Sequence, residues 1–232
     1  MSALGWRMGF RANLPVAASV AAYGSVLGVL AAQKGLGWAD VLLMDLMVFA
    51  GSSQFVMVDM WTSPLPTAAM AAAVGVINAR YVLITATLRP LFEGRRILEK
   101  LFFVHFVADE NWAVTMAARR QGGADLGHLW GGGVCLLGAW CLGTVAGVGF
   151  GAAVPDPEAW GLDFAFTAVF TALAVSLWRG SRRDGLPWLA AVAAACLGER
   201  LLPGTWYVLA GGLAGAVTAA CLPDEGEGGR RG

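Results

Sequence analysis

The apolar stretch Val41–Trp61 contains residues of the types that bind a polar solute: Asp45 and the run Gly51-Ser52-Ser53-Gln54. Glutamine offers donors and an acceptor, and serine hydroxyls bond to backbone groups and stabilise a kink. Inside a bilayer, a helix weakened by glycine persists only where protein or an aqueous cavity covers it. Interrupted helices of this kind hold solutes and ions. We therefore expect a solute site at Gly51–Gln54, with Asp45 one helical turn earlier as a coupling residue; a purely structural kink is the alternative.

Two further polar residues, Asn78 and Arg80, lie within the apolar run Leu65–Leu88. A guanidinium inside a membrane needs an acid or a carboxylate ligand. The acids available to it are Asp45, Asp59, Asp109, Glu110 and Asp163. One interpretation is an Arg–Asp pair that ties two helices together. The other places Asn78 or Arg80 along a solute pathway, in contact with the substrate.

The remaining acidic candidates are Asp109, Glu110 and Asp163. Asp109 and Glu110 can form a proton relay or gate, or they can lie on the hydrated face of an interfacial helix. Asp163 opens a later apolar run, where it serves either as an N-terminal cap or as part of a second half of the solute site.

The elements that position these residues are membrane helices. The chain is 57% hydrophobic and 14% charged, whereas a soluble domain carries about a quarter charged residues. The apolar runs are Ala12–Ala32, Val41–Trp61, Leu65–Leu88, Ile97–Ala118, Leu129–Phe150, Leu162–Trp178, Leu186–Leu202 and Thr205–Leu222. Because about 20 residues cross a bilayer, roughly six to eight of them can span it. We predict an all-α integral membrane protein with one domain over residues 1–223 and a short polar tail over 224–232.

The run Ile97–Ala118 decides the topology, because it carries both Asp109 and Glu110. A central acid costs about 2.5–3.5 kcal/mol on insertion. If this run does not fully cross, about seven crossings remain and Lys and Arg concentrate on the cytoplasmic side, as the positive-inside rule requires. Two three-helix halves, residues 12–88 and 129–202, would then be inverted repeats with discontinuous helices.

Several other functions are disfavoured. The cysteines form no Cys-x-x-Cys pair, so we expect neither a metal site nor a disulfide. The formal net charge is zero and basic residues form only short clusters between apolar runs, which gives no reason to expect nucleic-acid binding. A serine hydrolase would need Ser52 or Ser53 with His105 or His128 as base, and this weak pattern leads us to expect a non-enzyme without cofactors. A channel or a non-transporting assembly subunit is the other alternative.

Glycine faces such as Gly24-x-x-x-Gly28 predict tight helix packing or a homo-oligomer.

Four segments together resemble the AzlC family of branched-chain amino acid permeases: VFAGSSQF (48–55), NARYVLITATLRP (78–90), ADEN (108–111) and GLDFAFTAVF (161–170). The resemblance covers nearly the whole chain in order. It implies a multi-pass protein of the bacterial inner membrane. It also implies a secondary exporter of branched-chain or other small apolar amino acids that acts with a small hydrophobic subunit of the AzlD type.

The resemblance also concerns the candidate site. The family pattern maps onto Gly51 and Gln54, Asn78 and Arg80, Asp109 and Glu110, and Asp163. The chain departs from that pattern at Asp45 and Asp59, where small or apolar residues are expected. An added acid can change the charge preference for the ligand or the coupling of transport.

Overall fold

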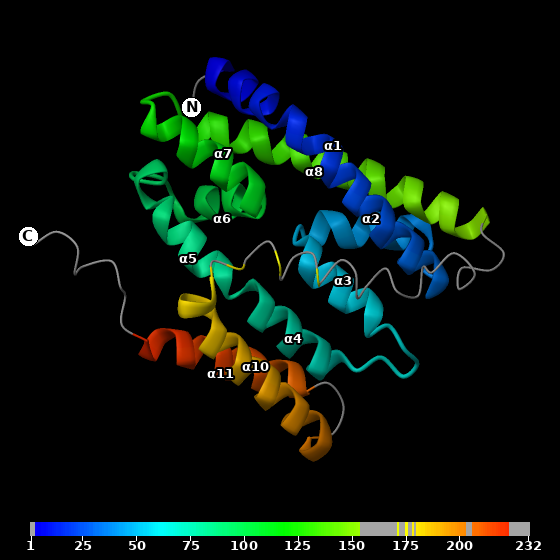
Figure 1. The fold of residues 1–232 in the computed structure, drawn as a ribbon. Coiled ribbons are helices and arrows are strands. Elements are labelled where there is room, and N and C mark those ends of the chain that lie inside the picture. Colours follow the sequence, from blue (N-terminus) through cyan, green and yellow to red (C-terminus); the bar gives the residue numbers. More distant parts are fainter. Residues whose placement is uncertain are drawn as a thin grey trace, which may run out of the picture. The chain divides into compact units, whose positions relative to one another are not determined.

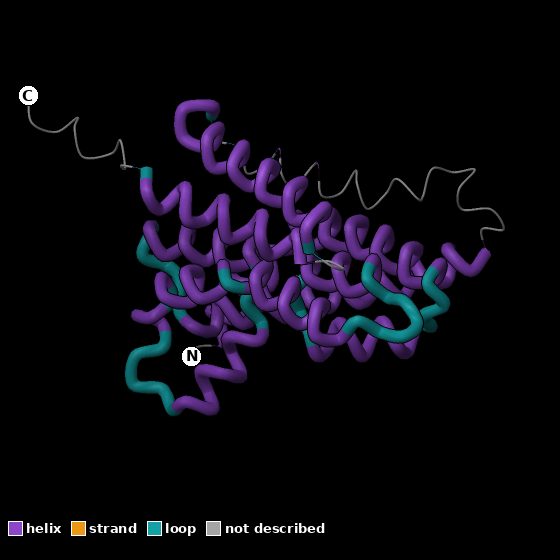
Figure 2. Tube along the Cα trace, turned by 90° about the horizontal axis from the view of Figure 1, so that it is seen from below, coloured by secondary structure: helices purple, strands orange, loops and turns teal. Residues whose placement is uncertain are grey.

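The computed structural model describes residues 3–153, 171, 175, 178, 180–202 and 206–222. Every regular element within these ranges is helical (Figures 1 and 2). The helices fall into two compact units, one within Met1–Leu65 and Ile77–Phe166 and one within Pro66–Val76 and Thr167–Gly232. This confirms the all-α class. All candidate site residues that the structure describes lie in the first unit.

Helices α1 (Ala3–Gln33) and α8 (Leu126–Ala153) form the long pair of the first unit. Their backbones touch at glycines: Gly9 abuts the His128 carbonyl, Gly28 the Thr144 carbonyl, and Gly151 lies against Val29. The contact points advance along both helices in the same direction, so α1 and α8 run parallel (Figure 1). The predicted tight packing through glycine is confirmed for Gly28.

The apolar run Val41–Trp61 forms two short helices, α2 (Trp38–Met47) and α3 (Gly51–Asp59), separated by three non-helical residues. Both outer ends lie near the C-terminal end of α1, because Lys34 Nζ donates a hydrogen bond of 3.1 Å to the Asp59 carbonyl. The segment therefore goes in and returns as a helical hairpin, which we call the first hairpin. The predicted interruption of this run is found, but it lies at Val48–Ala50. Gly51–Gln54, which were expected to form the break, are instead the first turn of α3.

The run Leu65–Leu88 forms α4 (Thr67–Asn78) and α5 (Arg80–Thr87), followed by the short helix η1 (Arg89–Leu91). Asn78 is the last residue of α4 and Arg80 is the first of α5. The two candidate residues of this run therefore flank a point where one helix ends and the next begins.

The run Ile97–Ala118 is also interrupted. It forms α6 (Ile97–His105) and α7 (Asp109–Arg120), with a bend at Phe106–Ala108. Asn111, which is fully buried, closes this bend. Its amide accepts from the Ala108 N–H at 2.7 Å and donates to the carbonyls of Phe106 (2.8 Å) and Leu129 (3.1 Å). One side chain thus satisfies the Ala108 N–H and the Phe106 carbonyl of the bend and links it to α8. We call α6 and α7 the second hairpin.

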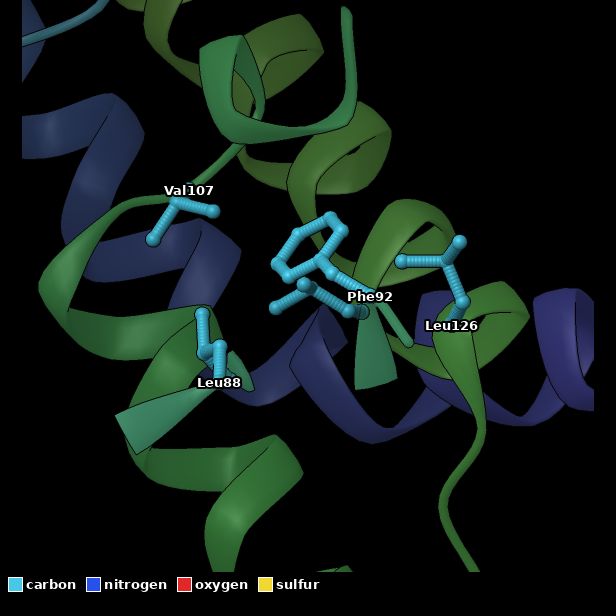
Figure 3. Packing of buried hydrophobic residues seen from close by; sticks show 5 residues of the cluster. Leu88, Phe92, Val107 and Leu126 are labelled. Atoms are coloured by element: carbon cyan, nitrogen blue, oxygen red, sulfur yellow. The ribbon is translucent and has the colours of Figure 1, made fainter. Parts of the chain in front are cut away.

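An apolar cluster fixes the second hairpin against its neighbours. Leu88 and Phe92 flank η1, Val107 lies in the bend, and Leu126 and Leu129 begin α8; all five are buried (Figure 3). On the outer side of the cluster, the Trp112 indole donates to Thr87 Oγ1 at 2.8 Å. The cluster therefore joins the start of α7 to the end of α5.

In the second unit, α10 (Ser181–Leu201) and α11 (Trp206–Cys221) form an antiparallel pair. Gly198 lies against Tyr207, and Gly215 lies against Ala191 and the Pro187 carbonyl, so the contacts descend α10 as they ascend α11. No candidate site residue lies on either helix.

Three helical segments among the described residues are long and apolar enough to cross a membrane: Leu4–Gln33, Thr67–Thr87 and Leu126–Gly151. The count of about seven crossings is not confirmed. The inverted relation between residues 12–88 and 129–202 is not confirmed either, because α1 and α8, which open the two halves, run in the same direction. The run Leu162–Trp178, with Asp163, lies almost wholly outside the described residues.

Candidate functional site

The break between α2 and α3 is covered by α8. Gly51, the first residue of α3, lies so close to Trp140 that a Cβ atom there would be 2.9 Å from the indole Cη2. Any side chain at this position would push the indole away. Gly51 therefore allows the tryptophan to close over the break, which is a packing reason beyond the helix weakening that the sequence indicated.

A buried polar network links the two arms of the first hairpin to α8. Asp45 of α2 and Gln54 of α3 are both fully buried. Gln54 Nε2 donates to Asp45 Oδ1 at 2.7 Å. Trp140 Nε1 is shared between Asp45 Oδ1 at 3.0 Å and Gln54 Oε1 at 2.9 Å, and Thr144 Oγ1 donates to Asp45 Oδ2 at 2.5 Å. We call these four residues the Asp45 network.

Aromatic rings surround the Asp45 network. The Tyr23 ring of α1 lies 4.8 Å from the Phe55 ring and 5.8 Å from the Trp140 ring, measured between centroids. Polar groups in such surroundings need internal partners, because water cannot supply them. The hydrogen-bonding partners of Asp45 in the network are neutral donors, so they stabilise its carboxylate without cancelling its charge.

A second group of polar contacts joins the inner ends of the two hairpins. Arg80 Nη2 donates to Ser52 Oγ, in the first turn of α3, at 2.8 Å. Arg80 Nη1 pairs with Oδ2 of Asp109, the first residue of α7, at 2.9 Å. Ser53 Oγ donates to Asn78 Oδ1 at 2.7 Å. Arg80 therefore bridges the N-terminal turns of two helices that each follow an interruption.

Two polar atoms of the ion pair are buried and have no hydrogen-bond partner within the described part of the chain: Arg80 Nε and Asp109 Oδ1. Buried polar groups are normally paired. These two atoms thus leave a donor and an acceptor available to a small polar molecule. The Tyr23 hydroxyl of α1 is another buried polar atom without a partner among the described residues.

The structure brings most of the predicted site residues together. Asp45 and Gln54 share the Asp45 network, and Ser52, Ser53, Asn78, Arg80 and Asp109 form the contacts at the inner hairpin ends. Glu110 follows Asp109 in the first turn of α7 and is exposed. Asp163 lies outside the described residues, so its assignment stays a prediction.

The serine hydrolase alternative finds no supporting geometry among the described residues. The Ser52 and Ser53 hydroxyls pair with Arg80 and Asn78, whereas His128 Nδ1 lies 3.3 Å from Thr115 Oγ1. No serine–histidine hydrogen bond of a hydrolase is seen among the described residues. These residues also contain no group of three or more His, Cys, Asp or Glu placed to hold a metal ion.

Tyr23, Trp140 and Thr144 were not predicted from the sequence as members of the site. Trp140 carried a signal, because it lies well inside an apolar run while most tryptophans of the chain lie at run ends. An indole away from the headgroup level must find a partner for its N–H inside the protein. Tyr23 and Thr144 carried no comparable signal.

Comparison with known proteins shows to which family this chain belongs. The profile of the AzlC protein family matches residues 15–154, which contain every described residue of the site. The chain belongs to the AzlC family. It is 25% identical over 196 residues to the branched-chain amino acid transport protein AzlC of Bacillus subtilis, covering 77% of this chain and 70% of that protein. It is also 24% identical over 188 residues to an uncharacterized membrane protein of Helicobacter pylori strain J99, covering 80% of each. No solved structure matches the chain.

Proposed function

We propose that this AzlC-family chain is a secondary transporter that exports branched-chain and other small apolar amino acids. The observation that carries the proposal is the bridge by Arg80 between the first turns of α3 and α7. Each of these helices begins after an interruption inside an apolar run. Such half-helix ends present unpaired backbone N–H groups, which suit an anionic group of a solute.

The chemistry of the ligand fits this arrangement. A branched-chain amino acid has a carboxylate, an ammonium and a compact apolar side chain. The charged ends need polar partners inside the membrane, while the side chain favours apolar surroundings. Ser52, Ser53, Asn78 and Arg80 offer the polar partners. The name of the B. subtilis relative supports the same ligand class.

The proposal includes a driving force. No nucleotide-binding segment occurs in the sequence, so transport would use a proton gradient or the membrane potential. Asp45, Asp109 and Glu110 are the proposed coupling and gating residues. Asp45 is buried among neutral donors, where gain or loss of a proton would change the strength of every hydrogen bond that it accepts.

We propose that the chain works in the bacterial inner membrane, with a small AzlD-type subunit beside it. Large apolar side chains are exposed on the first unit, among them Val82 (70%), Leu98 (76%) and Leu142 (75%). Surfaces of this kind suit lipid, a small hydrophobic partner or a second copy of the chain.

Amino acid efflux tests this function. Cells that lack endogenous exporters are loaded with a Leu- or Val-containing dipeptide, and internal and external amino acid pools are followed with and without the chain and its small partner. We expect lower internal leucine or valine when both are present. Identical internal pools would refute export. Saturable exchange of labelled leucine in proteoliposomes would in addition exclude the channel alternative.

A further inference from the structure

We infer that the Arg80–Asp109 ion pair is the receptor for both charged ends of a zwitterionic ligand. The ligand carboxylate binds Arg80 beside the start of α3, and the ligand ammonium binds Asp109 at the start of α7. This inference rests on the proposed transport function and specifies the recognition step within it.

The ion pair is incomplete as it stands. Arg80 and Asp109 are joined through one nitrogen and one oxygen, at 2.9 Å. The usual two-contact fork between a guanidinium and a carboxylate is not formed. Arg80 Nε remains as a buried donor and Asp109 Oδ1 as a buried acceptor, both without partners in the described chain. A carboxylate supplies the acceptor that the first lacks, and an ammonium supplies the donor that the second lacks.

The charges near α3 favour an additional anion. The N–H groups of Gly51, Ser52 and Ser53 belong to the first turn of α3, where no intrahelical acceptor exists. The partial positive charge of this helix end adds to the full charge of Arg80, which contacts Ser52. Asp109 is the nearest counter-charge, and it is itself drawn to the N-terminus of α7. A ligand carboxylate at this helix end would accept hydrogen bonds from these N–H groups and from Arg80 Nε.

The charges near α7 favour an additional cation. Asp109 and Glu110 are consecutive carboxylates in the first turn of this helix, and Arg80 pairs with only one of them. Asp109 Oδ1 is the acceptor that lacks a partner in the described chain, and an ammonium can donate to it.

An α-amino acid meets both demands with two groups attached to one carbon atom. An amine without the carboxylate leaves Arg80 Nε and the α3 N–H groups unsatisfied, and an acid without the ammonium leaves Asp109 Oδ1 unsatisfied. Sites built to pair with a polar group discriminate strongly against ligands that lack it. The structure thus assigns specificity for zwitterions to Arg80 and Asp109.

The test measures exchange of labelled L-leucine in proteoliposomes that contain the full chain with its small partner. The competitors are L-leucine, 4-methylpentanoate, which lacks the amine, and 3-methylbutylamine, which lacks the carboxylate. For the wild type, we expect each analogue to compete at least about tenfold more weakly than leucine. Arg80→Gln should raise the leucine KM by about tenfold to hundredfold, and Asp109→Asn should do the same.

The two variants should differ in which analogue they discriminate against. We call the ratio between the inhibition constants of an analogue and of leucine the gap for that analogue. In Arg80→Gln the gap for 3-methylbutylamine should close, while the gap for 4-methylpentanoate remains. Asp109→Asn should show the opposite pattern. A merely structural role would move both gaps alike. The matched controls are Arg89→Gln and Glu93→Gln, which remove charges from exposed side chains. Both should keep the native KM for leucine.

The control for folding is the double variant Arg80→Gln/Asp109→Asn, which removes both charges of the ion pair together and should lose both gaps. The inference is overturned if the wild type exchanges leucine but either analogue competes as well as leucine does. It is also overturned if the single variants keep the native KM and the native gaps. A wild-type protein that exchanges no amino acid would instead refute the proposed function.

Discussion

Replacement of Asp45 tests whether the Asp45 network holds the first hairpin together. The relevant comparison is between Asp45→Ala, which removes the carboxylate, and Asp45→Asn, which keeps its shape and removes its charge. The partners of Asp45 determine what each change leaves behind, and they predict different losses of stability.

In Asp45→Ala, one hydrogen-bond donor of the Asp45 network, Gln54 Nε2, is left without an acceptor. Gln54 Nε2 loses its 2.7 Å hydrogen bond to Asp45. Trp140 Nε1 keeps its bond to Gln54 Oε1 at 2.9 Å, and Thr144 Oγ1 keeps its bond to the Cys141 carbonyl at 3.1 Å. An orphaned buried donor costs about 1–3 kcal/mol and a methyl-sized void about 1 kcal/mol. Because both variants lose the buried charge alike, we expect Asp45→Ala to have a free energy of unfolding about 2–4 kcal/mol lower than that of Asp45→Asn.

In Asp45→Asn, every contact can be kept. The amide oxygen replaces Oδ1 and still accepts from Gln54 and Trp140. The amide nitrogen replaces Oδ2 and donates to Thr144 Oγ1, whose own hydrogen still reaches the Cys141 carbonyl. The hydrogen bonds weaken with loss of the charge, but the cost of burying that charge disappears as well. We expect the stability of Asp45→Asn to lie within about 1 kcal/mol of the wild type.

The assay is unfolding of the purified protein by SDS in mixed micelles, followed by far-ultraviolet circular dichroism. Thr144→Val, alone and combined with Asp45→Asn, provides the control: its cost should be larger when the residue at 45 carries a charge. Equal stability of Asp45→Ala and Asp45→Asn would show that the orphaned Gln54 amide carries no penalty, and the reasoning would then be wrong.

Three further predictions concern other parts of the site and the fold. Gln54→Ala should abolish amino acid efflux while membrane insertion, measured by fractionation, stays intact; full efflux would mean that Gln54 serves only to pack the first hairpin. Asp45→Asn should keep leucine exchange but lose its dependence on a pH gradient, and an unchanged dependence would exclude Asp45 as the coupling residue. Gly147→Ala should lower the melting temperature because its Cβ would collide with the Ser25 carbonyl, whereas Gly149→Ala, which faces open space, should leave it equal or raise it by the helix propensity of alanine.

The interruption in the run Val41–Trp61 could be predicted to within a few residues, because Gly51, two serines and a glutamine mark a weak point in an apolar helix, although these four residues themselves form the first turn of α3. For the run Ile97–Ala118, the paired acids at 109 and 110 indicated only that it does not cross fully as one helix. The exact residues of the first break were not accessible. Helix α2 ends at Met47 and α3 begins at Gly51, where the glycine lies against Trp140 of α8. A contact with a residue so distant in the sequence cannot be anticipated from the residues around the break.

The partners across the fold could not be predicted in the same way. Arg80 had five candidate acids, and the choice of Asp109 depends on how the second hairpin packs against α5 and α8 through Leu88 and Val107. Asp45 and Thr144 are separated by 99 positions along the chain. No sequence period relates such residues, and an apolar helix shows the same composition on every face.

The parallel contact between α1 and α8 has a consequence for the route of a solute. Because glycines bring the two backbones together at Gly9, Gly28 and Gly151, a leucine-sized molecule cannot pass between these helices. The first hairpin packs on the C-terminal half of this pair, at Trp140 and Thr144, and the second packs on its N-terminal half, at Leu129. If the helix pair stays fixed while a solute moves, the two hairpins are the parts that open and close, each on its own half of the pair. Arg80 then lies where the inner ends of both hairpins meet, because it contacts Ser52 and Asp109.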